Sequence, residues 1–154
     1  MLELIKKIDP HIINCFRKYE IILARLAIFV VYFWFGFLKI IGFSPATPLV
    51  QALFEKTIDF MPFSTFYILF AIFEVVIGTL FLIRGLERVA ILMLGLHLIT
   101  TAMPLVLLPQ IAWQGFMIPT LEGQYMIKNV LILACAVVIG SRLIPMSFPD
   151  GKNS

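Results

Sequence analysis

The sequence predicts an all-α integral membrane protein, a four transmembrane helix bundle with an outer amphipathic helix between its first two spans. The 154 residues are 61% hydrophobic and only 14% charged, whereas soluble domains are roughly half apolar and about a quarter charged. The mean hydropathy is correspondingly high, at +1.02. Apolar residues also come in continuous runs of about 20, the length that a helix needs to cross the hydrocarbon core. Helices are the expected form there because the backbone must satisfy its own hydrogen bonds.

Four apolar runs are long enough to span a bilayer. These runs cover about residues 21–41, 65–83, 88–108 and 125–143. A β-barrel would show shorter, alternating segments instead. Pro104 and Pro109 predict that the third span kinks or ends near them. No remaining stretch is large enough to hold a soluble core, so we expect a single membrane domain over 1–154.

The segments outside the spans carry helix signals of their own. We interpret residues 1–20 as a cytoplasmic interfacial segment, with Phe16 on the apolar side of a short helix. Between the first two spans, Thr47 can cap a helix and Pro48 suits its first position. The sequence therefore predicts an amphipathic helix over 48–59, lying at the outer surface or folded over the bundle.

The lysines and arginines predict the orientation. If the N-terminus is cytoplasmic, nine of the twelve lie on the inner side and three on the outer side. The inner set is Lys6, Lys7, Arg17, Lys18, Arg25, Arg84, Arg88, Arg142 and Lys152, and the outer set is Lys39, Lys56 and Lys128. This asymmetry is the positive-inside pattern, which predicts a multi-pass bacterial inner-membrane protein with both termini cytoplasmic. The net charge of +3 then calls for a lipid bilayer as partner and needs no nucleic acid.

A carboxylate in the middle of the second span is the clearest functional signal. Ionisable groups at this depth are rare and usually face a partner, a cavity or a substrate path. Helical spacing aligns Glu74 and His97 with the small and polar stripes of their spans, near the midplane. Lys39 and Lys128 lie closer to the outside, within reach of Glu74. We expect these four residues, with Glu122 just above them, to form one polar cluster in the outer half of the membrane.

The role of this cluster is open from the residues alone. Glu74 must be neutral or paired with a lysine, so the pair either fixes helix register or serves a substrate or proton. The aromatic run that contains Tyr32 and Trp34 either packs at the interface or lines a site for a flat ligand. A metal would need three or more ligands, and only His97 and Glu74 offer themselves at one depth, so no metal site is predicted. We assign no catalytic residue.

An ordered set of residues over about 20–143 resembles the DoxX-like superfamily of four-helix membrane proteins. The set comprises Arg25, an aromatic–x–Gly–x–x–Lys formed by Trp34, Gly36 and Lys39, the Glu–x–x–x–Gly of Glu74 and Gly78, the group Thr100, Thr101 and Pro104, and finally Gly123 and Lys128. The closest similarity is to a branch of small inner-membrane proteins linked to bacterial resistance to reactive chlorine species. This chain differs from that branch in its short connection after the first span and in His97.

The resemblance implies a role in membrane redox homeostasis or oxidant defence, with quinone as the implied ligand. At most the chain would be a membrane subunit of a quinone-linked oxidoreductase. Lys39 and Lys128 would then hold a quinone carbonyl or an anionic group, Glu74 would balance charge or pass a proton, and His97 would assist. Tyr32 and Trp34 would form an apolar wall for the ring.

Two other functions use the same residues. The chain could be a proton-linked transporter of a small anion, with the lysines binding the anion and Glu74 carrying the proton. It could also be a non-catalytic membrane subunit whose polar cluster only fixes packing. A second copy of the chain or a redox partner subunit would cover part of its apolar surface. The sequence names neither the substrate nor the partner.

Overall fold

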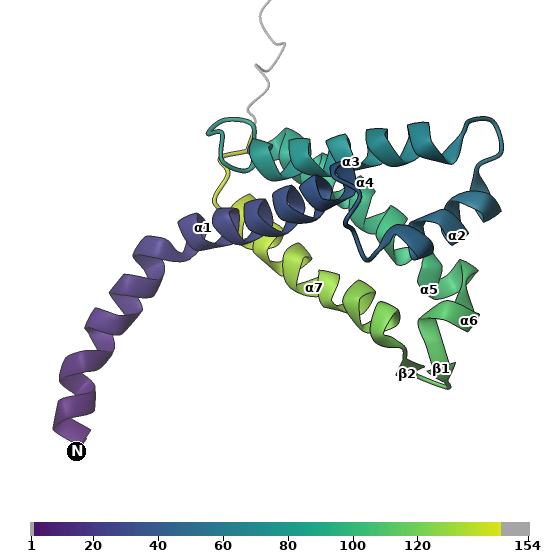
Figure 1. Ribbon diagram of the computed structural model, residues 1–154. Coiled ribbons are helices and arrows are strands. Elements are labelled where there is room, and N and C mark those ends of the chain that lie inside the picture. The colour runs from purple at the N-terminus through teal and green to yellow at the C-terminus, as the bar shows by residue number, and fades with distance from the viewer. Residues whose placement is uncertain (1, 146–154) are drawn as a thin grey trace, which may run out of the picture.

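The computed structural model describes residues 2–145, with side chains from residue 9 onward (Figure 1). Within this part the chain forms seven helices and one two-stranded hairpin. In chain order these are α1 Leu2–Ile40, α2 Thr47–Thr57, α3 Phe63–Leu80, α4 Glu87–Ala102, α5 Pro104–Leu107, α6 Pro109–Ala112, β1 Trp113–Gly115, β2 Ile118–Pro119 and α7 Leu121–Gly140. Lys6, Lys7 and Lys152, which contribute to the predicted orientation, lie outside the residues whose side chains are described.

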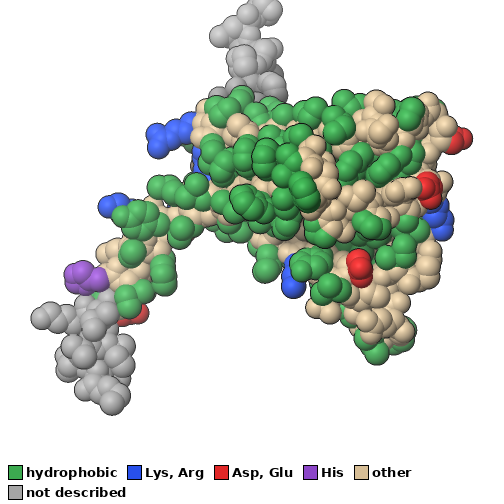
Figure 2. Space-filling view, in the orientation of Figure 1, with side chains coloured by type: hydrophobic (Ala, Val, Ile, Leu, Met, Phe, Trp, Pro, Cys, Tyr) green, Lys and Arg blue, Asp and Glu red, His purple; other side chains and the backbone are tan. Residues whose placement is uncertain are grey.

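Four stretches of helix are long and apolar enough to cross a membrane. They are Asp9–Ile40, Phe63–Leu80, Glu87–Leu107 and Leu121–Gly140, and each predicted span falls on one of them. Their outward faces are apolar: Leu92, Ile99 and Leu131 are each about two-thirds exposed, and hydrophobic side chains cover much of the visible surface (Figure 2). A soluble monomer rarely exposes so much apolar area. The prediction of a helical, multi-pass membrane protein is confirmed.

The four long helices contact one another in a closed order. α1 packs on α3 and α7, and α4 also packs on α3 and α7. The contact between α1 and α3 is the most extensive because each helix presents a glycine to the other. A Cβ added to Gly36 would lie 2.9 Å from the Ala71 carbonyl oxygen, and one added to Gly78 would lie 2.9 Å from the Phe33 nitrogen. Small residues allow such close approach of membrane helices.

The molecule has two distinct ends (Figure 1). We call the end with α2, α5, α6 and the β1–β2 hairpin the hairpin end. The other, with the α3–α4 connection at 81–86 and residues 141–145 after α7, is the turn end. α1 and α4 run toward the hairpin end, whereas α3 and α7 run toward the turn end. The first turns of α1 project away from the other helices.

α2 is packed against the start of α3. Its buried Phe54 contacts the rings of Phe63 and Phe66, with centroids 5.5 and 4.9 Å away. Lys56 ties α2 to α5 by donating from Nζ to the Leu107 carbonyl oxygen over 2.7 Å. The helix predicted over 48–59 therefore exists with slightly earlier bounds. The predicted cap is wrong, because the N-cap residue is Ala46 and Thr47 is already the first residue of the helix, with its hydroxyl donating to the Ser44 carbonyl oxygen.

Two further segments differ from the sequence analysis. The short interfacial helix predicted before the first span is continuous with that span in α1. The connection before α7 holds a hairpin that was not predicted, in which Trp113 pairs with Pro119 and Gly115 with Ile118. Met117 lies between these strands at φ 58°, a conformation that three-to-five-residue turns often require. The breaks at the two prolines are as predicted: α4 ends just before Pro104, where α5 begins, and α6 begins at Pro109.

Candidate functional site

The centre of the α1–α3 contact holds a buried ion pair. Lys39, in the last turn of α1, places Nζ 2.6 Å from Oε2 of Glu74 on α3. Both residues are only 5% exposed. Lys39 reaches back along α1 because helical side chains point toward the N-terminus of their own helix. The aligned glycines make the pair feasible, since they bring the two backbones close enough for a short contact.

His97 and Tyr32 extend this pair into a hydrogen-bonded chain across three helices. Nε2 of His97, on α4, lies 3.1 Å from the second carboxylate oxygen of Glu74. Nδ1 of His97 lies 3.0 Å from the Tyr32 hydroxyl on α1. All four side chains are buried. We call Tyr32, Lys39, Glu74 and His97 the polar centre.

The hydrogen bonds favour one tautomer of His97. A carboxylate only accepts hydrogen bonds, so Nε2 carries the proton and donates to Glu74, and Nδ1 accepts from the Tyr32 hydroxyl. An imidazolium would add a second positive charge to the lysine with only one carboxylate to balance both. Such an excess charge is costly away from water. The polar centre is therefore neutral as a whole, and its three hydrogen bonds are all directed along the chain toward Glu74.

Aromatic rings surround His97. Phe70 stacks on the imidazole, with centroids 5.0 Å apart and planes 18° from parallel, and Tyr32 meets the imidazole edge-on at 5.0 Å. Phe73 lies at 6.2 Å. Lys39 Nζ also lies 5.8 Å from the Phe70 ring centroid, within the range of a cation–π contact. The polar centre is thus enclosed by rings and has a low-dielectric surrounding, which strengthens its internal hydrogen bonds.

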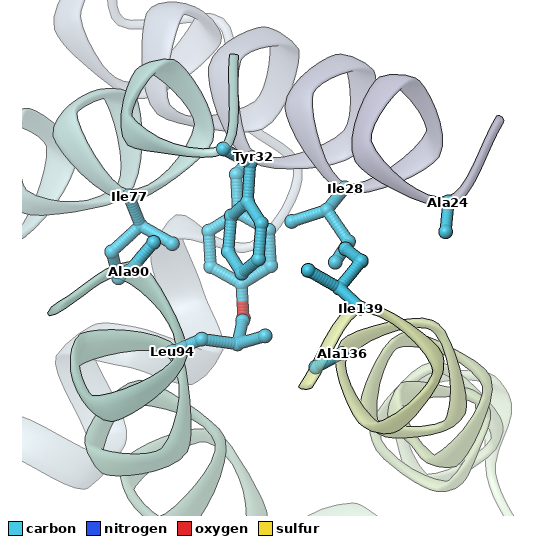
Figure 3. Close-up of a cluster of buried hydrophobic side chains, with 9 residues drawn as sticks. Ala24, Ile28, Tyr32, Ile77, Ala90, Leu94, Ala136 and Ile139 are labelled. Atoms are coloured by element: carbon cyan, nitrogen blue, oxygen red, sulfur yellow. The ribbon is translucent and has the colours of Figure 1, made fainter. Parts of the chain in front are cut away.

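On its turn-end side the polar centre is followed by a cluster of buried apolar side chains (Figure 3). The fully buried side chains there come from all four long helices. They include Ile28, Ile77, Phe81, Leu94 and Ile139, each no more than 1% exposed. Tyr32 belongs to the same cluster through its ring, so this one side chain joins the apolar core to the polar centre.

On its hairpin-end side the polar centre is followed by hydroxyl and amide groups. Tyr67, two turns before Glu74 on α3, has its hydroxyl 2.6 Å from Thr47 Oγ1. Thr101, one turn after His97 on α4, accepts from Asn129 on α7 over 3.3 Å. Thr47 gives its own proton to the Ser44 carbonyl oxygen at 2.8 Å, so Tyr67 is the donor to Thr47.

Three residues of the predicted cluster lie elsewhere. Lys128 is exposed on α7, with its ammonium 5.1 Å from the Tyr125 ring centroid. It follows the buried Met126 by two residues, which is about 200° around a helix and therefore the opposite face. Trp34 follows Tyr32 by the same spacing and is 59% exposed, so it forms no wall of the site. Glu122 is exposed at the start of α7.

The turn end holds a second ion pair that the sequence analysis did not find. Arg25 of α1 pairs with Glu87 at the start of α4, and Glu87 also accepts from the Gly85 backbone nitrogen at 2.8 Å. Arg142 pairs with Glu20 at the surface. Each of these two arginines thus has a carboxylate partner on another helix.

Phe70 and Glu87 are the two residues of these contacts that the sequence analysis missed. A phenylalanine in an apolar span is one among many, and nothing in its spacing links Phe70 to His97. Glu87 had a weak signal as an acidic residue in the first turn of a helix, a favourable position next to the helix dipole. Glu87 is 62 residues from Arg25 in the sequence, so no spacing rule within one helix predicts that the two residues pair.

The described residues contain no group of three or more His, Cys, Asp or Glu side chains that could hold a metal. A hollow of about 250 Å³ lies at the hairpin, lined by Trp113, Gly115, Phe116 and Met117. It is open and apolar, and no residue of the polar centre lines it, so the chemistry of the polar centre is the more informative feature.

Fold and site together define a small, helical, multi-pass membrane protein with a buried ionic centre. Comparisons of the chain with protein-family models, with curated proteins and with solved structures give no match.

Proposed function

We propose that this chain is a bacterial inner-membrane protein of the DoxX-like type whose polar centre binds the head group of a quinone. Its role would be membrane redox homeostasis or defence against oxidants such as reactive chlorine. The observation that carries the proposal is the unused hydrogen-bonding capacity of Lys39. A lysine ammonium has three N–H donors, yet among the described residues Lys39 makes one hydrogen bond, to Glu74. A buried donor with unused capacity suits a ligand that brings an acceptor.

The proposed membrane arrangement supports this reading. The four long helices would cross as a bundle, with the turn end cytoplasmic and α2 at the outer surface. Arg25, Arg84, Arg88 and Arg142 lie at or near the turn end, and Lys56 lies at the hairpin end. Lys39 is buried and so does not count as a loop residue. The remaining asymmetry follows the positive-inside pattern, which supports a cytoplasmic position for both termini.

In this proposal each member of the polar centre has a distinct task. Lys39 would donate to a carbonyl oxygen of the head group, and Glu74 would hold the balancing negative charge. His97 would assist by donating from Nε2 to Glu74 while its Nδ1 accepts from the Tyr32 hydroxyl. Phe70 and Phe73 would provide the apolar surroundings that exclude water. A quinone would supply two-electron redox chemistry coupled to proton uptake.

Mass spectrometry of solvent extracts from gently purified protein tests the proposal. The matched variants are Lys39→Met, Glu74→Gln and, as a control, Lys128→Met, which removes an exposed lysine. We expect a quinone in stoichiometric amount with the parent and the control, and its loss from both variants of the polar centre. Absence of quinone from the parent, or equal amounts in every variant, would reject this function.

A specific observation favours a second candidate, proton-linked transport of a small anion. The partner of Lys39 is Glu74, a group that can take a proton. An anion that displaced Glu74 from Lys39 would favour protonation of that carboxylate, which couples the two ligands. Flux of an anion into proteoliposomes, driven by a pH gradient and uncoupled by Glu74→Gln, would support it. If the variants neither lose a ligand nor change flux and only alter stability, the polar centre serves packing in a non-catalytic subunit.

A further inference from the structure

The surroundings of the polar centre differ sharply between its two sides. Toward the turn end, the buried side chains that follow it are apolar. On α1 the six residues between Arg25 and Tyr32 are all apolar, and Arg25 and Tyr32 are about 10 Å apart along the helix at 1.5 Å per residue. α3 contributes Ile77, α4 contributes Leu94 and α7 contributes Ile139, all essentially without exposure. Beyond this layer lies the Arg25–Glu87 pair.

Toward the hairpin end, polar side chains continue from the polar centre. Because α3 starts at the hairpin end, Tyr67 lies on that side of Glu74. Because α4 runs toward the hairpin end, Thr101 lies on that side of His97. Tyr67 and Thr101 each make a hydrogen bond to another helix, to Thr47 of α2 and to Asn129 of α7. Among the described residues, polar side chains therefore continue directly from the polar centre on this side, whereas the turn-end side begins with the apolar layer.

A polar ligand or a hydrated proton is strongly disfavoured in a layer without hydrogen-bonding groups. It can move past hydroxyls and amides that replace its water contacts. We infer that the polar centre is reached from the hairpin end only, and that the Tyr67–Thr47 hydrogen bond closes this route. The nature of the ligand, a head group with an acceptor for Lys39, rests on the proposed function, whereas the route follows from the packing.

The closure has a clear structural basis. Thr47 is the first residue of α2, and its hydroxyl proton is already given to Ser44. One donated bond from Tyr67 therefore holds the start of α2 over the polar centre. The rest of α2 is held separately, by Phe54 and Lys56. Loss of the Tyr67 hydroxyl should loosen the cover at this point without detaching the helix.

Two buried alanines provide matched reporters. Ala71 lies between Tyr67 and Glu74 on α3, and Ala90 lies in the apolar layer on α4, and both are 0% exposed. Each would be changed to cysteine in a full-length protein that carries Cys15→Ser and Cys135→Ala. The exposed positions Gln51 and Arg84, changed to cysteine in the same way, would define the hairpin-end and turn-end sides.

The test is labelling of these reporters in proteoliposomes with a small, membrane-impermeant methanethiosulfonate. We expect Ala71→Cys to react from the side that labels Gln51→Cys, and faster when Tyr67→Phe is added. We expect Ala90→Cys to be protected from both sides. Thr101→Cys replaces Ala71→Cys as reporter if the latter does not fold, as judged by thermal unfolding.

Labelling of Ala90→Cys, or of Ala71→Cys from the side of Arg84→Cys, would overturn the inference. Protection of Ala71→Cys from both sides in the Tyr67→Phe protein would overturn it as well. The readout involves no quinone. One-sided labelling together with an extract that contains no quinone would therefore reject the proposed ligand and keep the route. Quinone in the extract together with labelling from both sides would keep the ligand and reject the route.

Discussion

Lys39 and Glu74 form an ion pair between α1 and α3, with Nζ and Oε2 2.6 Å apart and both side chains about 95% buried. The surroundings of the pair include the Phe70 ring, which stacks on His97, and the closely approaching backbones of α1 and α3. Breaking such a pair leaves one charge without compensation in an apolar medium. Removing both charges leaves none.

The first prediction follows from this difference between removing one charge and removing both. Lys39→Met or Glu74→Gln alone should lower the free energy of unfolding by about 3–5 kcal/mol, the usual cost of an uncompensated buried charge. The double variant should lose much less than the sum of the two. Unfolding of all four proteins in the same detergent measures the coupling. Equal, additive losses would show that the two side chains do not interact.

The tautomer of His97 is a second prediction. Because Glu74 accepts from Nε2 and Tyr32 donates to Nδ1, His97 should be neutral with its proton on Nε2. Nitrogen-15 NMR of protein labelled at histidine distinguishes the two tautomers and the imidazolium. The chain has only two histidines, so a His11→Gln variant assigns the signals. A proton on Nδ1 would mean that the order of donors in the chain is reversed.

Tyr32→Phe should affect stability more than the equivalent change at a surface tyrosine. It removes the donor to His97 and leaves a buried Nδ1 without a partner, a loss of about 1–3 kcal/mol. Tyr125→Phe is the matched control, because Tyr125 is 60% exposed and its ring can still lie under Lys128. Thermal unfolding compares the two. A similar small effect of both changes would argue against the bond to His97.

The close approach of α1 and α3 is testable at one glycine. Gly78→Ala places a Cβ 2.9 Å from the Phe33 nitrogen and 3.1 Å from the Tyr32 Cβ, so we expect a destabilisation of about 1–3 kcal/mol from overpacking. Gly95→Ala, in the interior of α4 with no atom within 4 Å of the added Cβ, should be neutral or stabilise by about 0.5–1 kcal/mol. Gly78→Ala should also weaken quinone retention if the proposed site is correct, whereas Gly95→Ala should not.

The two ion pairs near the turn end should differ in strength. The Arg142–Glu20 pair is exposed, with side-chain exposures of 60% and 31%, and such pairs contribute about 0–1 kcal/mol. Arg25 and Glu87 are 18% and 10% exposed, and Glu87 also holds the Gly85 nitrogen. Glu87→Gln should therefore destabilise the protein clearly more than Glu20→Gln. The reverse order in thermal unfolding would contradict the described contacts.

Several features of the fold could be predicted without coordinates. The spans followed from the length of the apolar runs, and the breaks near Pro104 and Pro109 followed from the missing amide proton of proline. The stripe pattern correctly predicted that Glu74 and His97 point inward, and Lys39 lies within reach of Glu74 as expected. In these helices small and polar residues share a face and the opposite face is apolar, so the pattern determines which face points toward the other helices.

The residue pattern of the fourth span did not determine which of its faces points inward. Lys128 was expected to point inward because a charge avoids lipid. It lies seven residues from the start of α7, or about 10 Å along the helix, and a lysine stem is long enough to extend its ammonium toward the interface. The inward face of α7 instead carries Met126, Ala136 and Ile139. Trp34 was placed at the site because it shares an aromatic run with Tyr32, although the two side chains lie on opposite sides of α1.

The sequence by itself determined that this protein is helical, that it has four membrane-length helices and that Glu74 needs a partner. These depend on local quantities: hydropathy, helical period and the cost of a lone charge in hydrocarbon. Only the tertiary structure decided which partner each charge has. Gly36 and Gly78 bring α1 onto α3, so Lys39 reaches Glu74 and Lys128 does not, and the start of α4 meets α1 where Arg25 lies. Such choices depend on distances between helices, which no pattern within one helix encodes.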